Sequence, residues 1–219
     1  MSDIRDVNLD FDRENRTGLA EAVFCAGKSL AQLETICDTI IAGSKSMLFT
    51  RLSEEAFAHL EEKYPGTLSF DVVSGTAFHL PQAGRLVEPV AVVTGGSSDL
   101  PVAREASRTL EFYGIPALEI HDVGVAGLWR ITERLSALRE CRIIICVAGM
   151  DAALPTVLGG LVPAALIAVP TSVGYGMVKG GETALRSLLV SCAPGVTVTN
   201  IDNGYGAACA AIRILNCFT

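Results

Sequence analysis

From residue 89 onward, short runs of apolar residues alternate with longer stretches in which apolar residues recur at helical spacing. Short continuous apolar runs predict strands buried on both faces, and the stretches between them predict helices. This alternation is typical of a parallel sheet covered by helices on both faces, so we expect a three-layer αβα sandwich of the α/β class. The predicted strands are residues 90–94, 117–120, 143–147, 165–169 and 196–201, and the predicted helices are residues 100–113, 126–138, 152–158, 182–189 and 207–215.

The first part of the chain is richer in charge and lacks this regular alternation. Its pattern predicts a polar lead-in, an amphipathic helix, a short strand and a second helix that ends at Pro65-Gly66. We therefore expect two domains: a small α+β domain over residues 1–86 and an α/β domain over residues 87–219. The elements predicted in the first domain are the lead-in 10–16, the helix 28–42, the strand 46–50 and the helix 54–64.

Composition narrows the class of protein. Hydrophobic residues make up 50% of the chain and charged residues 19%, which predicts a large core and argues against long disorder. The net charge of −7 argues against a nucleic-acid surface, because such surfaces are usually basic. Residues 1–12 lack a signal-peptide pattern, and the seven cysteines lack metal-ligand spacing, so we expect reduced thiols in a cytoplasmic protein and no metal site. Residues 153–170 are strongly apolar, but three prolines favour a helix and a buried strand over a membrane span.

The first predicted strand is followed by a turn of small and polar residues that opens a helix. Glycines let such a turn approach a ligand closely, and the hydroxyls and free amides at a helix start bind phosphate or carboxylate. The alternative is that Asp99 caps the helix and no ligand binds. The candidate phosphate-binding residues are Gly96, Ser97, Ser98 and Asp99.

The second predicted strand is followed by residues 121–130. His121 could act as an acid or a base, but a structural role is equally consistent with a single histidine. Trp129 could stack on a ring, although covering the core is the favoured interpretation, and Arg130 is expected on a solvated helix face. The candidate binding residues here are Asp122, Gly124 and Ala126.

The loops after the other three strands are also small and polar. Asp151 follows a very apolar strand and could either cap the next helix or act as a general base. Because ligands of parallel sheets bind at the carboxyl ends of the strands, we expect all five loops to contribute to one site. The remaining candidate binding residues are Gly149, Met150, Thr171, Ser172, Gly174, Tyr175, Asn200, Asp202 and Asn203.

Cys192 lies in a Ser-Cys-Ala-Pro-Gly turn over residues 191–195. A cysteine thiolate is a strong nucleophile near neutral pH, so Cys192 is the candidate catalytic nucleophile and Asp151 its candidate partner. The alternative is that Cys192 is a small buried apolar residue.

Several of these strings resemble known families. From residue 90 to the C-terminus, the chain is similar to the superfamily of PurE, the bacterial purine enzyme that moves a carboxylate on aminoimidazole ribonucleotide, and residues 97–101 resemble its phosphate-binding turn. Nearly the whole chain resembles the LarB family more closely. The matching strings are residues 12–13, 16–18, 27–29, 50–51, 122–127, 148–150, 169–176, 191–195 and 200–204.

The resemblance implies an enzyme that carboxylates the pyridinium ring of nicotinic acid adenine dinucleotide and hydrolyses its phosphoanhydride, releasing AMP. The product, a pyridinium biscarboxylate mononucleotide, is a precursor of the nickel-pincer nucleotide used in lactate racemase maturation. It also implies that the Cys192 thiolate adds to the ring, that the neighbouring carbon attacks CO₂, and that a carboxylate, here Asp151, removes the ring proton before the thiolate leaves.

The resemblance further implies a PurE-like fold and a homo-oligomer, such as an octamer, with sites between subunits. We expect CO₂ or bicarbonate as co-substrate and no tightly bound cofactor, although Mg²⁺ could accompany the pyrophosphate. No nucleic acid or membrane is expected as a partner. Of the matching arginines, Arg13 is expected to pair with acidic residues, whereas Arg16 and Arg51 could do so or bind phosphate.

Two positions differ from the LarB pattern, which has glutamate at position 151 and histidine at position 129, where this chain has Asp151 and Trp129. Because an indole cannot shuttle a proton, Trp129 argues against aminoimidazole ribonucleotide chemistry. Two alternatives stay open: a relative that acts on another nucleotide, and a non-catalytic oligomeric nucleotide-binding protein.

Overall fold

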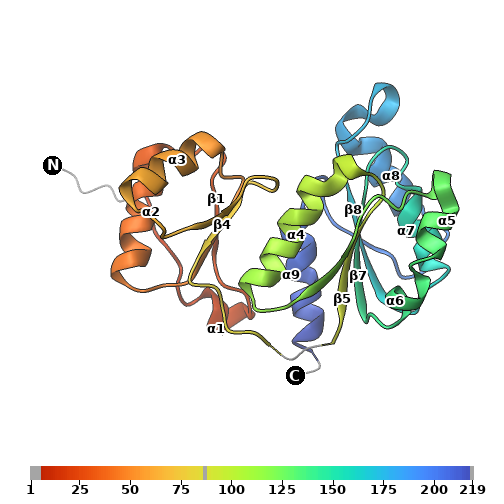
Figure 1. Ribbon diagram of the computed structural model, residues 1–219, viewed down its shortest axis with the longest axis horizontal. Helices are drawn as coiled ribbons and strands as arrows, with labels where there is room; N and C mark the ends of the chain where they lie inside the picture. Colours follow the sequence, from red (N-terminus) through yellow and green to blue (C-terminus); the bar gives the residue numbers. More distant parts are fainter. Residues whose placement is uncertain (1–5, 86–87, 218–219) are drawn as a thin grey trace. The chain divides into compact units, whose positions relative to one another are not determined.

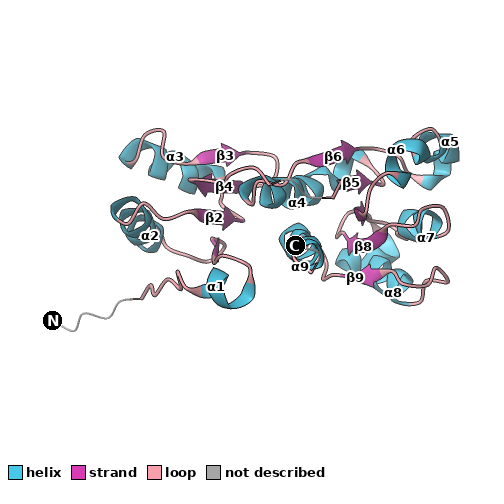
Figure 2. Cartoon of the chain, turned by 90° about the horizontal axis from the view of Figure 1, so that it is seen from below, coloured by secondary structure: helices cyan, strands magenta, loops and turns pink. Residues whose placement is uncertain are grey.

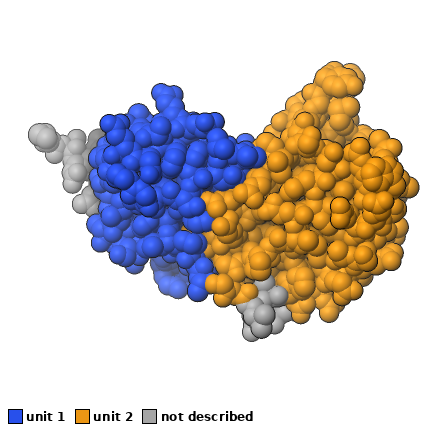
Figure 3. Space-filling model, in the orientation of Figure 1, with its two compact units in different colours: residues 1–83 blue, residues 84–219 orange. Residues whose placement is uncertain are grey.

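The computed structural model describes residues 6–85 and 88–217. The chain divides into two compact units, Met1–Ala83 and Gly84–Thr219, which Figure 3 colours separately. The predicted domain boundary falls on residues 86–87, which lie outside the described residues.

Unit 1 is a small α+β unit built on a mixed sheet (Figure 1). Its strands follow the order β1-β2-β4-β3, in which β1 and β2 are parallel and β4 is antiparallel to both of its neighbours. Leu33 and Ile40 of α2, Phe49 of β2 and Leu60 of α3 belong to one buried cluster, so the two helices cover this sheet. The elements are α1 Arg13–Thr17, β1 Ala22–Phe24, α2 Leu30–Ala42, β2 Met47–Thr50, α3 Glu54–Lys63, β3 Ser69–Asp71 and β4 Thr76–His79.

The helix starts of unit 1 follow from capping chemistry. Ser29 accepts a hydrogen bond from the Gln32 backbone N–H, and the Gln32 side chain accepts one from the Ser29 N–H. This reciprocal capping box fixes the start of α2 two residues after the predicted start at residue 28. Ser53 caps α3 in the simpler way, through the Ala56 N–H.

Unit 2 is a three-layer αβα sandwich, as predicted. In residues 88–217 the strands form one parallel sheet in the order β6-β5-β7-β8-β9. Helices α4 and α9 pack together on one face, and α5 to α8 lie on the other (Figures 1 and 2). The strands are β5 Val90–Thr94, β6 Ala117–Ile120, β7 Ile143–Ala148, β8 Ala165–Pro170 and β9 Thr197–Val198, and the helices are η1 Ser97–Asp99, α4 Leu100–Phe112, η2 Val125–Gly127, α5 Leu128–Thr132, α6 Leu135–Arg139, α7 Ala153–Gly159, η3 Gly176–Gly181, α8 Glu182–Leu189 and α9 Gly204–Leu215.

Strands β5 and β7 are buried along their whole length, which explains their continuous apolar sequences. The order of strands reverses between β5 and β7, because the chain goes from β5 outward to β6 and then crosses back to β7. In open α/β sheets, the crevice at the carboxyl ends beside such a reversal is the usual ligand site.

Two predicted elements are corrected by the structure. The predicted helix over residues 126–138 is broken into η2, α5 and α6, with a tight turn in which the Arg134 N–H donates to the Ile131 carbonyl. The predicted strand over residues 196–201 pairs over β9 alone, because the chain then turns so that the Asp202 N–H reaches the Pro170 carbonyl. No helix among the described residues combines the length and hydropathy that a membrane span requires.

Candidate functional site

The five loops that follow the parallel strands are tied to one another by hydrogen bonds at the carboxyl edge of the sheet. At the end of β5, the Thr94 side chain accepts from the Asp122 N–H at 2.9 Å, and the Thr94 carbonyl accepts from the Val123 N–H. The Asp122 backbone has a positive φ of 56°. Thr94 therefore fixes the loop after β6 to the end of β5, a role that the sequence analysis missed. The sequence does contain a signal for this role, because Thr94 is a polar residue at the end of an apolar strand.

Asp99 is the centre of this network. It is 3% exposed, and its two carboxylate oxygens accept from the Thr171 hydroxyl at 2.7 Å and from the Gly96 N–H at 2.9 Å. Burial raises the pKa of the Asp99 carboxyl, although hydrogen bonds from Thr171, Gly96 and Gly149 act in the opposite direction. Asp99 thus joins three strand-end loops and fixes the turn at Gly96.

Gly149 permits a close approach between two loops of the site. A methyl group in place of its hydrogen would lie 2.5 Å from the Val173 carbonyl oxygen and 2.6 Å from the Thr171 hydroxyl. The Met150 N–H also donates to the Val173 carbonyl at 3.0 Å. Only glycine lets the loops after β7 and β8 pack together in this way.

The loop after β9 closes the other side of the network. The Asp202 carboxylate accepts from the Ser172 N–H at 2.8 Å, and Asn203 caps α9 through the Gly206 N–H at 2.7 Å. The Asn200 side chain accepts from the neighbouring Ile201 N–H. These candidate binding residues therefore hold the loops in place.

A second group of predicted residues faces solvent. Ser97 and Ser98 are exposed at the start of the helical segment that leads into α4, and their hydroxyls have no protein hydrogen-bond partner in the described part of the chain. Backbone N–H groups and hydroxyls at the start of a long helix favour an anion. This turn is the part of the site that is open to a phosphate.

The rim of the carboxyl edge is apolar. Large apolar side chains that are at least 43% exposed occur on the loops after β6, β7 and β8. Small-molecule sites are typically lined by apolar and aromatic side chains together with a few polar groups. The rim residues are Leu128, Trp129, Met150, Tyr175 and Met177.

Trp129 lies differently from its favoured interpretation, whereas Arg130 is partly exposed on α5 as expected. Trp129 is 62% exposed, so it does not cover the core. Arg130 pairs with the Asp122 carboxylate at 3.3 Å and lies over the indole, 5.7 Å from the ring centroid. Arg130 is therefore part of the strand-end cluster. His121 instead contacts Glu119 of the edge strand at 3.0 Å.

Asp151 and Cys192 lie in separate loops. Asp151 is exposed at the carboxyl edge and accepts a long hydrogen bond of 3.4 Å from the Ala153 N–H at the start of α7. Cys192 is exposed in the turn that connects the end of α8 to the start of β9. Its neighbour Ser191 contacts Thr156 of α7 at 2.7 Å. The alternative of a buried apolar Cys192 is therefore wrong.

The remaining candidates lie in the strand-end loops. Gly124 packs against the loop after β5, because a methyl group there would lie 2.8 Å from the Gly95 carbonyl oxygen. Ala126 belongs to η2. Gly174 has a φ of 137°, which favours glycine, and lies against Met150. The structure thus places the predicted binding residues in the loops at the carboxyl edge, whereas Cys192 lies in the turn before β9. Among the described residues, no group of three His, Cys, Asp or Glu side chains is arranged to hold a metal ion.

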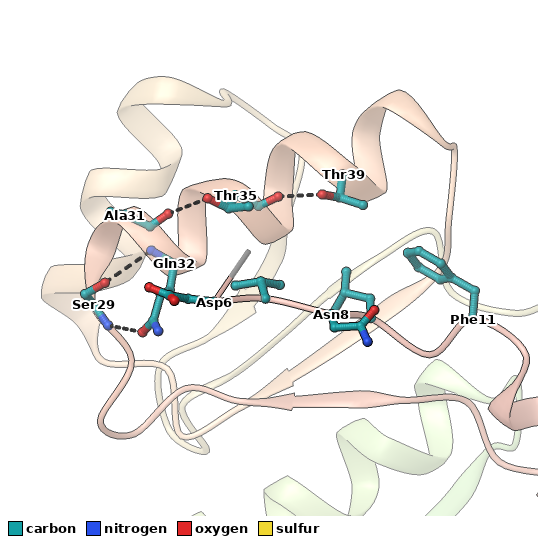
Figure 4. A pocket seen from close by; sticks show the side chains of 10 residues that line it. Asp6, Asn8, Phe11, Ser29, Ala31, Gln32, Thr35 and Thr39 are labelled. Carbon is teal, nitrogen blue, oxygen red and sulfur yellow. Dashed lines mark hydrogen bonds between the residues drawn. The ribbon is translucent and has the colours of Figure 1, made fainter. Parts of the chain in front are cut away.

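Unit 1 contains a separate pocket, whose volume is about 900 Å³, between residues 6–11 and α2 (Figure 4). Its polar side chains on α2 bond within that helix: Thr35 donates to the Ala31 carbonyl, Thr39 donates to the Thr35 carbonyl, and Ser29 and Gln32 form the capping box. Asp6 and Asn8 line the pocket from the segment that precedes α1.

Two of the matching arginines of unit 1 pair with carboxylates. Arg13 pairs with Asp10 at 3.3 Å and Glu21 at 3.1 Å, as predicted. Arg16 pairs with Asp10 at 2.6 Å and with Asp12 at 2.8 Å.

Comparisons with known proteins agree with this architecture. Residues 89–219 match the family model of AIR carboxylase, and residues 1–78 match that of the LarB/PurE-like N-terminal domain. An uncharacterized protein of Methanocaldococcus jannaschii is 34% identical over 92% of this chain and 80% of its own length. The N5-carboxyaminoimidazole ribonucleotide mutase of Pyrococcus horikoshii is 31% identical over 58% of this chain and 71% of its own length. The crystal structure of a Treponema denticola PurE2 variant superposes with a TM-score of 0.52 at 21% identity, covering 61% of this chain and 83% of that one.

The α/β unit and its strand-end site therefore define a PurE-like domain of the carboxylase and mutase class. With the N-terminal unit included, the chain belongs to the LarB family.

Proposed function

We propose that this protein carboxylates the pyridinium ring of nicotinic acid adenine dinucleotide with CO₂ and hydrolyses the phosphoanhydride to release AMP. The product would be the pyridinium biscarboxylate mononucleotide from which the nickel-pincer nucleotide is made. The proposal rests on one observation: a LarB-type N-terminal unit precedes a carboxylase-type unit that carries both an exposed thiol and an exposed carboxylate.

Each step of this reaction has a residue suited to it. The open Ser97-Ser98 turn at the start of α4 binds a phosphate of the dinucleotide. The Cys192 thiolate forms a bond to the electron-poor ring, which makes the neighbouring carbon nucleophilic enough to attack CO₂. Asp151 then takes the proton from that carbon, the bond between sulfur and carbon breaks, and the ring regains its aromaticity. The carboxylation consumes one CO₂ and releases one proton, and the separate hydrolysis consumes one water.

The expected oligomer adds a second part to the proposal. Asp151 and Cys192 act on neighbouring ring atoms and are carried by separate loops, one before α7 and one before β9. We propose that the site combines the Asp151 loop of one copy with the Cys192 turn of a second copy. The exposed Leu189 and Val190 beside that turn provide an apolar surface for such a contact.

The test measures carboxylated product and AMP for three variants. Cys192→Ser is expected to abolish carboxylation, whereas Cys217→Ser, which changes another exposed cysteine, should retain it. Asp151→Asn is expected to lower the rate by about 10²–10⁴-fold, the usual contribution of a general base. Unchanged carboxylation by Cys192→Ser would contradict the proposal.

Mixing the two inactive variants tests the shared site. If the two residues come from different copies, reassembly of Cys192→Ser with Asp151→Asn in equal amounts restores roughly a quarter of the wild-type activity, because one site in four receives both intact residues. If both residues come from one chain, no activity returns.

A further inference from the structure

Trp129 is exposed at a position where the fold does not need an indole. It is the single tryptophan of the chain, it lies in the first turn of α5, and 62% of its surface is open. Burial of a large aromatic side chain is strongly favourable, so an exposed indole leaves much of that stabilisation unused. Trp129 lies at the carboxyl edge of the sheet, where ligands of parallel sheets bind, so its exposed indole is placed to contact a ligand.

The indole is held in place on one side. The Arg130 guanidinium lies 5.7 Å from the ring centroid and also pairs with the Asp122 carboxylate at 3.3 Å. Asp122 is in turn fixed to the end of β5 through its N–H and the Thr94 side chain. A chain of contacts therefore runs from the sheet to one face of the indole and leaves the rest of the ring exposed.

The segment that carries this ring follows a loop that packs against the candidate phosphate-binding turn. The loop after β6 packs directly against the loop after β5, as the close approach of Gly124 to the Gly95 carbonyl shows. Ser97 and Ser98 follow in the latter loop. A nucleotide whose phosphate binds at these serines would have its base within reach of Trp129.

We propose that Trp129 is a specificity-determining residue that stacks on the adenine ring of the substrate. This inference rests on the proposed function for the identity of the nucleotide. Stacking of a base on an aromatic side chain needs only two π-faces, and adenine is neutral. The pyridinium ring is cationic, and a cation is a poorer partner for an indole that already faces the Arg130 guanidinium. The charge of Arg130 therefore favours the adenine half of the dinucleotide over the pyridinium half.

Tryptophan fluorescence tests this inference directly, because all of the emission comes from Trp129. Titration with AMP is expected to change the emission, whereas titration with nicotinic acid mononucleotide is expected to change it little. Calorimetry should show that Trp129→Ala weakens AMP binding on the order of tenfold, the usual effect of losing one stacked base, while Trp129→Phe keeps most of the affinity.

Two controls separate stacking from other effects. Val72→Ala changes an apolar residue of unit 1 that is 56% exposed and lies outside the strand-end loops, so it should leave AMP binding unchanged. Ribose 5-phosphate, which has no base, should bind wild type and Trp129→Ala equally. Unchanged AMP affinity in Trp129→Ala, no AMP binding by the wild type, or an emission change with nicotinic acid mononucleotide alone would overturn the inference.

The binding experiments do not depend on whether the protein catalyses the proposed reaction. If AMP binds through Trp129 but the dinucleotide is not carboxylated, the proposed reaction fails and the stacking role stands. If carboxylation proceeds with an unchanged KM in Trp129→Ala, the stacking role fails and the reaction stands.

Discussion

Replacement of Gly149 by alanine should damage the site and the fold together. The added methyl group would lie 2.5 Å from the Val173 carbonyl oxygen and 2.9 Å from the Val173 Cβ. Comfortable contacts between such atoms are about 3.5 Å, so the loops after β7 and β8 must separate by about 1 Å. Overpacking of this kind costs about 1–3 kcal/mol. For a unit of this size, that corresponds to a fall in Tm of about 3–12 °C.

The same displacement should reduce activity more than stability. A misplacement of about 1 Å in a site can lower the rate on the order of a hundredfold. Thermal unfolding followed by circular dichroism measures the change in stability, and AMP release measures the change in activity. Gly160→Ala is the matched control, because Gly160 has a φ of −91° and a methyl group there would meet only the Val157 carbonyl, at 3.6 Å. If Gly149→Ala melts and reacts like Gly160→Ala, the close approach of the two loops is not required.

Three further predictions concern packing and charge. Gly204→Ala should lower Tm in a thermal melt, because its methyl group would meet the Val102 carbonyl where α9 crosses α4. The pKa of Asp99 is raised in the folded protein, so its contribution to stability is present below its ordinary value of 3.8 and is lost as the pH rises through the folded value. Asp99→Asn should therefore remove that part of the pH dependence in urea titrations, and an unchanged pH profile would count against a buried carboxylate. The hydrogen bond from Lys63, and after it the one from His59, lowers the pKa of the Glu34 carboxyl. The interaction of Glu34 with these partners therefore contributes stability above pH 4.5, and this contribution is lost as the pH falls. Lys63→Met should raise the Glu34 pKa in an NMR titration, and no change would mean that the ion pair does not persist in solution.

The sequence predicts the sheet of unit 2 well because its strands are buried on both faces. Residues 90–94 and 143–147 read as continuous apolar runs, and β5 and β7 occupy them. β9 pairs with β8 over two residues alone. The bounds of such a short strand are determined by the loops on either side, so the periodicity of apolar residues cannot predict them. In unit 1, the strands β1, β3 and β4 have three or four residues each. An alternation of apolar and polar residues cannot be recognised in so short a segment.

The site is predictable in part. The five strand-end loops could be predicted, because topology brings the carboxyl ends of parallel strands together. The turn that carries Cys192 could be predicted from Pro194 and Gly195, but the contact of its neighbour Ser191 with Thr156 of α7 depends on tertiary structure. The exposure of Trp129 could not be predicted, because an indole in an amphipathic segment usually indicates core, and its contact with Arg130 depends on tertiary structure.

The most direct test of the central proposal is to incubate the wild-type protein with nicotinic acid adenine dinucleotide, ¹³C-bicarbonate and Mg²⁺, and to analyse the products by mass spectrometry. The proposed function predicts a mononucleotide that carries one labelled carboxylate on its pyridinium ring, together with an equal amount of AMP. Unchanged dinucleotide, or AMP with an unlabelled mononucleotide, while a control LarB enzyme reacts alongside, would contradict it.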